Sequence, residues 1–124
     1  MTAKPCLTVI IPTAGRREAL FTAIDSVKQQ SVPSDALVVL NGNTFDEEIA
    51  QRLRAMSSIQ LLEIDQPGLS NARHEGRKAL QSAYFTFLDD DDELLPEAAE
   101  IATAELDSDT SIGGLVTNGD IRFA

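Results

Sequence analysis

The sequence has a single cysteine, no tryptophan and no long hydrophobic run. One cysteine, Cys6, cannot form a disulfide bond within the chain, and chains without disulfides are typical of a reducing compartment. The longest apolar stretches, residues 6–11 and 36–40, are far shorter than the roughly 20 residues of a membrane-spanning helix. The first five residues lack the apolar core of a signal peptide. We therefore expect a cytoplasmic protein with no membrane segment in this chain.

Basic residues are also scarce. There are 10 lysines and arginines and 20 aspartates and glutamates, which gives a formal net charge of −10. A surface of this charge repels nucleic-acid backbones and anionic membranes, and no cluster of lysine or arginine reverses it locally. We therefore expect no nucleic-acid partner, whereas a divalent cation is compatible with the charge.

Short apolar, often β-branched runs alternate with segments whose apolar residues recur at helical spacing. The expected strands are residues 7–11, 36–40, 59–64, 84–88 and 112–117, and the expected helices are residues 16–30, 49–56, 70–81 and 96–106. We expect Ser70 to cap the third helix and Pro96 to occupy the first turn of the fourth. Cys6, at the start of the first strand, is interpreted as a small core residue.

Strands that alternate with helices predict an α/β fold, Rossmann-like, with a doubly wound, mostly parallel sheet and helices on both faces. A chain of 124 residues suffices for one compact domain of this kind. Ligands bind such folds at the carboxyl ends of the strands. Those ends carry residues 12–14, 41–43, 65–70 and 89–92, so functional residues are expected there.

Four consecutive aspartates, Asp89 to Asp92, directly follow the fourth expected strand. Carboxylates that emerge together at a sheet edge suit Mg²⁺ or Mn²⁺, which accept one or two protein carboxylates and take other ligands from phosphates and water. The alternative is a solvated acidic turn, because carboxylates are stabilised near the N-terminal end of a helix. The run alone does not separate these two interpretations.

Arg73 lies one element upstream, in the first turns of the third expected helix. Its guanidinium can orient a carboxylate or bind a phosphate through two parallel hydrogen bonds. Taken alone, a surface arginine is the simpler interpretation. The only histidine, His74, is interpreted as a solvent-facing or packing residue rather than a catalytic one.

Four motifs follow one another along the chain. The first strand leads into Pro12-Thr13, and residues 26–30 read S-V-x-x-Q at the end of the first helix. Residues 68–76 match G-x-S-x-A-R-N-x-G with His74 in place of the asparagine, and residues 87–92 match F-L-D-x-D-D with a proline four residues on. Together these motifs resemble the family 2 glycosyltransferases of the GT-A fold. The resemblance covers nearly the whole chain and implies the N-terminal, nucleotide-sugar-binding half of an inverting glycosyltransferase.

On the nucleotide side, the resemblance implies that Pro12, Thr13 and Ala14 cradle the nucleotide. The second strand of the family usually ends in two aspartates, the second of which often contacts the base. Here Leu40 and Asn41 occupy these positions. Asn41 keeps an acceptor oxygen for a uracil N–H group but loses the charge. The implied donor is a nucleoside-diphosphate sugar, often UDP-linked, and the identity of the base stays open.

On the metal side, the resemblance implies that Asp91 is the direct metal ligand. Asp90 would face the ribose or the sugar, and Asp89 would support the site. Arg73 would lie near these aspartates and the diphosphate. The implied cofactor is Mn²⁺ or Mg²⁺, which would offset the charge of the diphosphate and help the nucleoside diphosphate to leave.

The acceptor side of the family, with its general base, lies beyond the fifth strand. We therefore expect this chain, residues 1–124, to be the N-terminal part of a longer enzyme whose catalytic base lies beyond Ala124 and whose acceptor is an unknown glycan, lipid or protein. A non-catalytic nucleotide-sugar sensor is an alternative, supported by Leu40 and Asn41. A receiver domain is a weaker one, because it requires an acidic pair after the first strand and a late lysine, and no lysine follows Lys78.

Overall fold

The structure is a computed structural model, and it describes residues 5–117. Strands and helices alternate along the chain: β1 (Leu7–Thr13), α1 (Ala19–Lys28), β2 (Ser34–Asn41), α2 (Glu47–Ala55), β3 (Gln60–Ile64), α3 (Leu69–Lys78), β4 (Tyr84–Phe87) and α4 (Ala98–Ser108). The strands form one parallel sheet in the order β3-β2-β1-β4. The predicted α/β fold with a parallel sheet is confirmed.

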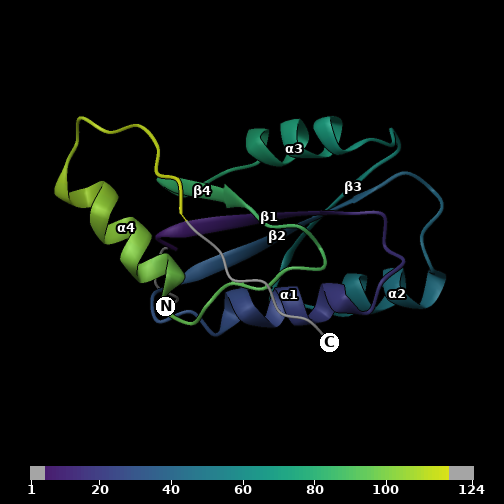
Figure 1. The fold of residues 1–124 in the computed structure, drawn as a ribbon. Helices are drawn as coiled ribbons and strands as arrows, with labels where there is room; N and C mark the ends of the chain where they lie inside the picture. The colour runs from purple at the N-terminus through teal and green to yellow at the C-terminus, as the bar shows by residue number, and fades with distance from the viewer. Residues whose placement is uncertain (1–4, 118–124) are drawn as a thin grey trace.

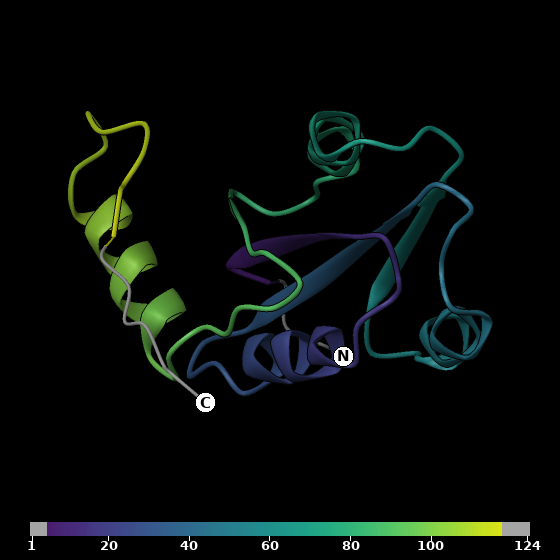
Figure 2. The same ribbon diagram turned by 45° about the vertical axis from the view of Figure 1, so that its right-hand side comes forward.

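Helices cover both faces of the sheet. Figure 2 shows α1 and α2 on one side of the strands and α3 on the other. The last helix, α4, lies beside the amino ends of the strands, away from the end at which β1 leads into its loop (Figure 1). Within residues 5–117, none of the helices combines the length and the apolarity that crossing a bilayer requires.

The central strand β1 is buried along its whole length because it contributes to two cores. Val9 and Ile11 pack with α1 and α2, whereas Ile10 packs with α3 on the opposite face. Side chains alternate across a strand, so a strand covered on both faces is apolar at nearly every position. The close approach of α3 depends on Gly76, where a Cβ atom would lie 2.7 Å from Cγ2 of Ile10.

The boundaries differ from the sequence predictions at several points. Ser70 lies inside α3 and does not cap it, because the cap position is Gly68, whose positive φ of 116° suits glycine. Pro96 lies in the turn that precedes α4. Cys6 is exposed rather than part of the core, because burial begins one residue later, where β1 starts.

The expected fifth strand, residues 112–117, is wrong. All six residues are exposed and none forms a strand, and the side chain of Val116 is 98% exposed. Gly113 and Gly114 interrupt the apolar run and weaken its preference for extended structure. The segment pairs with no strand in the described part of the chain, and a strand depends on a neighbour for its hydrogen bonds and packing.

Candidate functional site

The loop after β1 and the run of aspartates after β4 meet at one point. The hydroxyl group of Thr13, the last residue of β1, donates a hydrogen bond of 2.7 Å to Oδ2 of Asp90. The hydroxyl oxygen of Thr13 also accepts a hydrogen bond from the backbone N–H of Gly15 at 3.0 Å. The strand order reverses here, since β2 and β3 lie on one side of β1 and β4 on the other. Ligands of open α/β sheets bind at such a reversal.

A cavity of about 550 Å³ opens at this end of the sheet. Its walls come from the ends of β1 and β2, the loop before α1, the start of α3 and the aspartate run. The lining residues are Pro12, Thr13, Ala14, Arg16, Arg17, Asn41, Gly68, Leu69 and Asp90. The volume falls within the range of small-molecule sites. Five residues that the sequence predicted for donor binding therefore surround a single space.

Leu40 and Asn41 have different surroundings at the end of β2. Leu40 is 1% exposed, and a Cβ atom on Gly15 would lie 2.6 Å from its Cδ1. Asn41 is half-buried and donates its Nδ2 hydrogen to the carbonyl of Gly68 at 3.1 Å. Its amide oxygen makes no hydrogen bond within residues 5–117. Asn41, and not Leu40, therefore offers an acceptor to a ligand in the cavity.

The four aspartates separate into one held by the protein and three exposed to solvent. Asp90 is half-buried and bonded to Thr13. Carboxylate oxygens of Asp89, Asp91 and Asp92 lie within 4.8 Å of one another. Partial desolvation, followed by repulsion from Asp91, Asp89 and Asp90, raises the pKa of Asp92. Crowded carboxylate oxygens of this kind fit a hard divalent cation such as Mn²⁺ or Mg²⁺.

Two arginines flank these carboxylates. Nη1 of Arg17 lies 3.1 Å from Oδ2 of Asp91, and Nη2 of Arg73 lies 3.9 Å from Oδ1 of Asp89. The Nε atom of Arg73 is buried and has no hydrogen-bond partner in the part of the chain that the structure describes. Arg73 also stands over the ring of Phe87, with its Cζ 5.4 Å from the ring centroid. The structure thus brings both arginines to the aspartates from opposite elements, the loop before α1 and α3.

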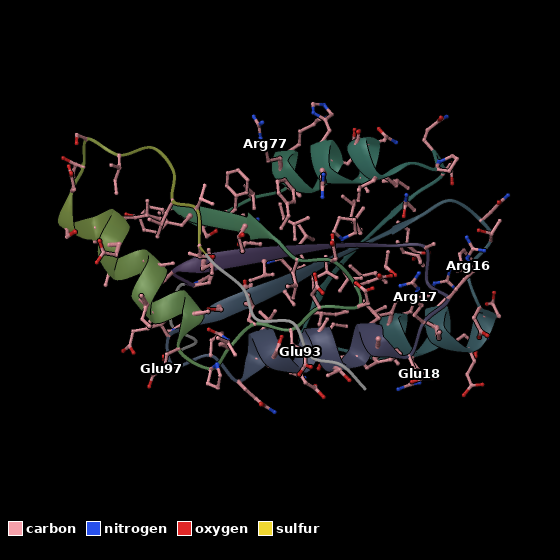
Figure 3. All side chains as sticks on the ribbon, viewed as in Figure 1. Arg16, Arg17, Glu18, Arg77, Glu93 and Glu97 are labelled. Atoms are coloured by element: carbon pink, nitrogen blue, oxygen red, sulfur yellow. The ribbon has the colours of Figure 1, made fainter. Side chains whose placement is uncertain are left out.

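Arg73 lies at the border of the site rather than inside the main cavity. It lines a second, shallower space of about 370 Å³ together with Ser70, His74, Arg77, Phe85 and Phe87. His74 is exposed there, in agreement with its interpretation as a solvent-facing residue. Arg77 lies further along the same helix (Figure 3).

Sequence reasoning did not assign three residues that the structure places at the site. Arg16 and Arg17 line the cavity, although the sequence suggested only that a helix starts there. Asp92 shares the carboxylate cluster with Asp89 and Asp91. The position of the two arginines could have indicated their place at the site, because they directly follow the loop after the first strand. Their direction relative to Asp91 depends on the turn between β1 and α1, which spacing alone does not define.

The S-V-x-x-Q motif holds the segment that follows the aspartates. The Nε2 group of Gln30 donates to the carbonyl of Leu95 at 2.8 Å, and its Oε1 accepts the N–H of Ala99 at 2.9 Å. The hydroxyl of Ser26 accepts the N–H of Leu94 at 3.0 Å. We call these bonds the α1 clasp. Glu93 and Glu97, labelled in Figure 3, lie on the clasped segment. The clasp fixes the exit of the aspartate run against α1.

Parallel strands, a cavity at the reversal of strand order and clustered carboxylates define an α/β protein with a candidate ligand site at the carboxyl ends of its strands. The family model described as glycosyl transferase family 2 matches residues 8–122. The chain therefore belongs to glycosyl transferase family 2, and the predicted class of enzyme, a glycosyltransferase, is confirmed at the level of the family. The receiver-domain alternative is excluded.

Two curated relatives are similar over most of the chain. The chain is 31% identical over 99 residues to the GalNAc(5)-diNAcBac-PP-undecaprenol beta-1,3-glucosyltransferase of Campylobacter jejuni, with 76% of this chain and 32% of the relative covered. It is 29% identical over 113 residues to Glycosyltransferase GlyA of Streptococcus pneumoniae, with 86% and 16% covered. The chain thus spans less than a third of the length of these two relatives.

Solved structures share the fold. TarS of S. aureus, residues 1–349, aligns with a TM-score of 0.70 and 21% identity, covering 82% of this chain and 32% of that one. The same protein in complex with UDP gives a TM-score of 0.67 and 22% identity, with 82% and 32% covered. These similarities confirm a GT-A-like architecture.

Proposed function

We propose that this chain binds a nucleoside-diphosphate sugar, UDP-linked, and serves an inverting, metal-dependent glycosyltransferase reaction with a glycan, lipid or protein acceptor. The observation that carries the proposal is the hydrogen bond between Thr13 and Asp90 beside the cavity. It joins the loop that would hold the nucleotide to the aspartates that would hold the metal. Residues 1–124 would act as one nucleotide-sugar-binding domain.

The nucleotide would lie against the end of β1. Pro12 and Thr13 are buried and Ala14 is half-buried, so this wall is already formed before a ligand arrives. Asn41 would accept the N–H group of a uracil through its amide oxygen. The complex of the structural relative TarS with UDP supports the choice of base.

The diphosphate would lie toward the aspartates. Asp91 would ligate Mn²⁺ or Mg²⁺ with support from Asp89, and Asp90 would face the ribose or the sugar. Arg73 would approach the diphosphate from α3, since its guanidinium already lies 3.9 Å from Asp89. When bound, the cation offsets the diphosphate charge and stabilises the leaving group. An inverting transfer also needs a general base at the acceptor hydroxyl, and we assign this role to no residue described here.

We also propose a cytoplasmic location. The supporting observation is that Cys6, the only cysteine of the chain, is free and exposed. A thiol in that position is stable in a reducing compartment. Labelling of Cys6 in intact cells by a membrane-permeant but not by an impermeant thiol reagent is the expected result.

Nucleotide binding tests the proposal directly. We expect UDP to raise the melting temperature in the presence of Mn²⁺ and to lose most of this effect in EDTA, because a ligand stabilises the state that binds it. GDP and ADP at equal concentration should give smaller shifts. Equal shifts for the three nucleotides would contradict the uracil assignment, and the absence of any shift with Mn²⁺ would contradict the proposed function.

A further inference from the structure

Arg17 contacts two parts of the site at once. It lines the cavity of about 550 Å³, and its Nη1 lies 3.1 Å from Oδ2 of Asp91. The guanidinium of Arg17 therefore forms an ion pair with the carboxylate that would ligate the proposed metal. Figure 3 shows Arg16 and Arg17 next to each other at the end of the sheet where β1 leads into α1.

The ion pair is one that a stronger cation can replace. The side chains of Arg17 and Asp91 are 63% and 51% exposed, and exposed pairs of this kind are weak. A divalent cation carries twice the charge of the guanidinium and draws on several oxygens. Asp89 and Asp92 supply such oxygens within 4.8 Å of that of Asp91. The cation therefore gains interactions that Arg17 cannot match.

Once separated from Asp91, the guanidinium remains tethered at the wall of the cavity. Its planar fork of N–H groups matches the oxygens of a phosphate and binds them through two parallel hydrogen bonds. Within the described residues, Asp91 is the only acceptor that Arg17 contacts. A diphosphate in the cavity is thus the natural second partner of this side chain.

We propose that Arg17 is a substrate-binding residue that neutralises Asp91 in the free protein and, after a divalent cation displaces it, binds the diphosphate of the donor. This inference rests on the proposed function. Arg17 would then have opposite effects on the affinity for the metal and on the affinity for the nucleotide. Arg17 opposes the cation when it binds alone and supports the nucleotide when both are present.

Arg16 provides the matched control. It is the neighbouring residue, carries the same charge and lines the same cavity. Among the residues that the structure describes, it forms no ion pair with the aspartates. If only the overall charge of the cavity mattered, substitution of either arginine would change Mn²⁺ affinity equally. The ion pair with Asp91 is lost only when Arg17 is substituted.

The experiment compares Arg17→Gln and Arg16→Gln with the unmodified chain by calorimetric titration, first with Mn²⁺ alone and then with UDP at saturating Mn²⁺. Arg17→Gln is expected to bind Mn²⁺ about two- to five-fold more tightly, the range that the loss of an exposed ion pair allows. It is expected to bind UDP about ten-fold more weakly, as for the loss of a charge-assisted hydrogen bond. Arg16→Gln should leave Mn²⁺ affinity within about two-fold.

Thermal melting shows whether each variant is folded, and we expect little change because the pair is exposed. Unchanged or weaker Mn²⁺ binding by Arg17→Gln would overturn the inference, as would unchanged UDP binding or an equal gain with Arg16→Gln. If the unmodified chain binds neither Mn²⁺ nor UDP, the proposed function itself fails. That outcome is distinct from a failure of the inference, in which the unmodified chain binds both.

Discussion

The two sides of the site are built differently. On the proposed nucleotide side, Thr13 is 3% exposed and Leu40 is 1% exposed, and hydrogen bonds within the protein hold the loop in place. On the proposed metal side, the side chains of Asp89 and Asp91 are 60% and 51% exposed, and arginines balance only part of the charge of the aspartate run. The proposed nucleotide side therefore has its shape before a ligand arrives. The proposed metal side carries excess negative charge that a cation can neutralise.

Removing a carboxylate from the exposed side should have the largest effect. Asp91→Ala is expected to weaken UDP binding in the presence of Mn²⁺ by about 100-fold or more, because the loss of the proposed direct ligand should exceed the 10- to 100-fold effect of supporting groups. The free energy of unfolding should change little, since the side chain is exposed. Calorimetry with UDP and Mn²⁺ measures the first quantity and urea unfolding the second.

Asp65 serves as the control for this variant, because it is an exposed aspartate that directly follows β3 at the same end of the sheet. Asp65→Ala should retain the affinity of the unmodified chain. Unchanged binding by Asp91→Ala would remove Asp91 from the metal site.

Breaking the α1 clasp should disturb the link between the two sides. Gln30→Ala removes bonds to Leu95 and Ala99 and is expected to lower the free energy of unfolding by about 2–3 kcal/mol, since it leaves the buried N–H of Ala99 without a partner. Mn²⁺ binding should weaken as well, because the segment after the aspartates is released.

Gln29→Ala is the matched control, since Gln29 is the exposed neighbour and should affect neither quantity. Chemical unfolding and Mn²⁺ titration measure the two effects. A stable Gln30→Ala variant would show that the clasp contributes little.

A substitution on the proposed nucleotide side can distinguish an effect on UDP affinity from an effect on stability. Thr13→Val removes the hydroxyl that bonds Asp90 and Gly15 and should cost about 1–2 kcal/mol of unfolding free energy. It should also weaken UDP binding, because Asp90 loses its anchor. Urea unfolding and nucleotide titration measure the two effects.

Thr8 offers the comparison, because it is also buried in β1 and its hydroxyl lies 2.7 Å from that of Ser82. Thr8→Val should reduce stability without changing UDP affinity. If both variants lowered UDP affinity equally, the effect of Thr13 would be one of general stability.

The smallest effect concerns pH. The pKa of Asp92 is raised, so the carboxyl group of Asp92 binds its proton more tightly in the folded chain than in the unfolded chain. Without metal, stability should therefore decrease as pH rises from the ordinary aspartate pKa through the raised one. Asp92→Asn should remove this decrease and be slightly more stable at pH 7, by less than about 1 kcal/mol because the group is exposed.

Glu63 should behave in the opposite way. The hydrogen bond from Arg54 lowers the pKa of Glu63. Its contribution to the free energy of unfolding is therefore present above the ordinary glutamate pKa and is lost as pH falls through the lowered pKa. Glu63→Gln should therefore reduce stability at neutral pH. Unfolding free energies of both variants between pH 3 and pH 7 give the two slopes. Parallel slopes would contradict the opposing shifts.

The sequence was sufficient to predict most of the fold because burial and periodicity coincide. The continuous apolar run of β1 indicates a strand covered on both faces, and the helical spacing of Leu20, Ile24 and Val27 indicates the face of α1 that is buried. Prediction failed where a neighbour decides the outcome. Residues 112–117 have the composition of a strand but pair with no strand among residues 5–117.

The grouping of several candidate site residues could be predicted in the same way. The rule that parallel strands direct ligands to their carboxyl ends led to Thr13, Asn41 and Asp90, which line one cavity. Arg17 was not predicted, although Asp91, the residue that it contacts, was assigned to the site. Such a contact depends on the side-chain direction in a turn, and local spacing does not encode this direction.

The strand order has a consequence for how the site comes into existence during synthesis. The partners Thr13 and Asp90 are separated by 77 positions, and β4 pairs with β1 although it is the last strand within residues 5–117. Synthesis from the N-terminus therefore makes β1, β2 and β3 before the strand that completes the cavity. Contacts of such long sequence separation form late and slow the overall rate. A nascent chain should acquire affinity for a nucleotide only after its aspartates have left the ribosome, with folding and competence for ligand arriving together.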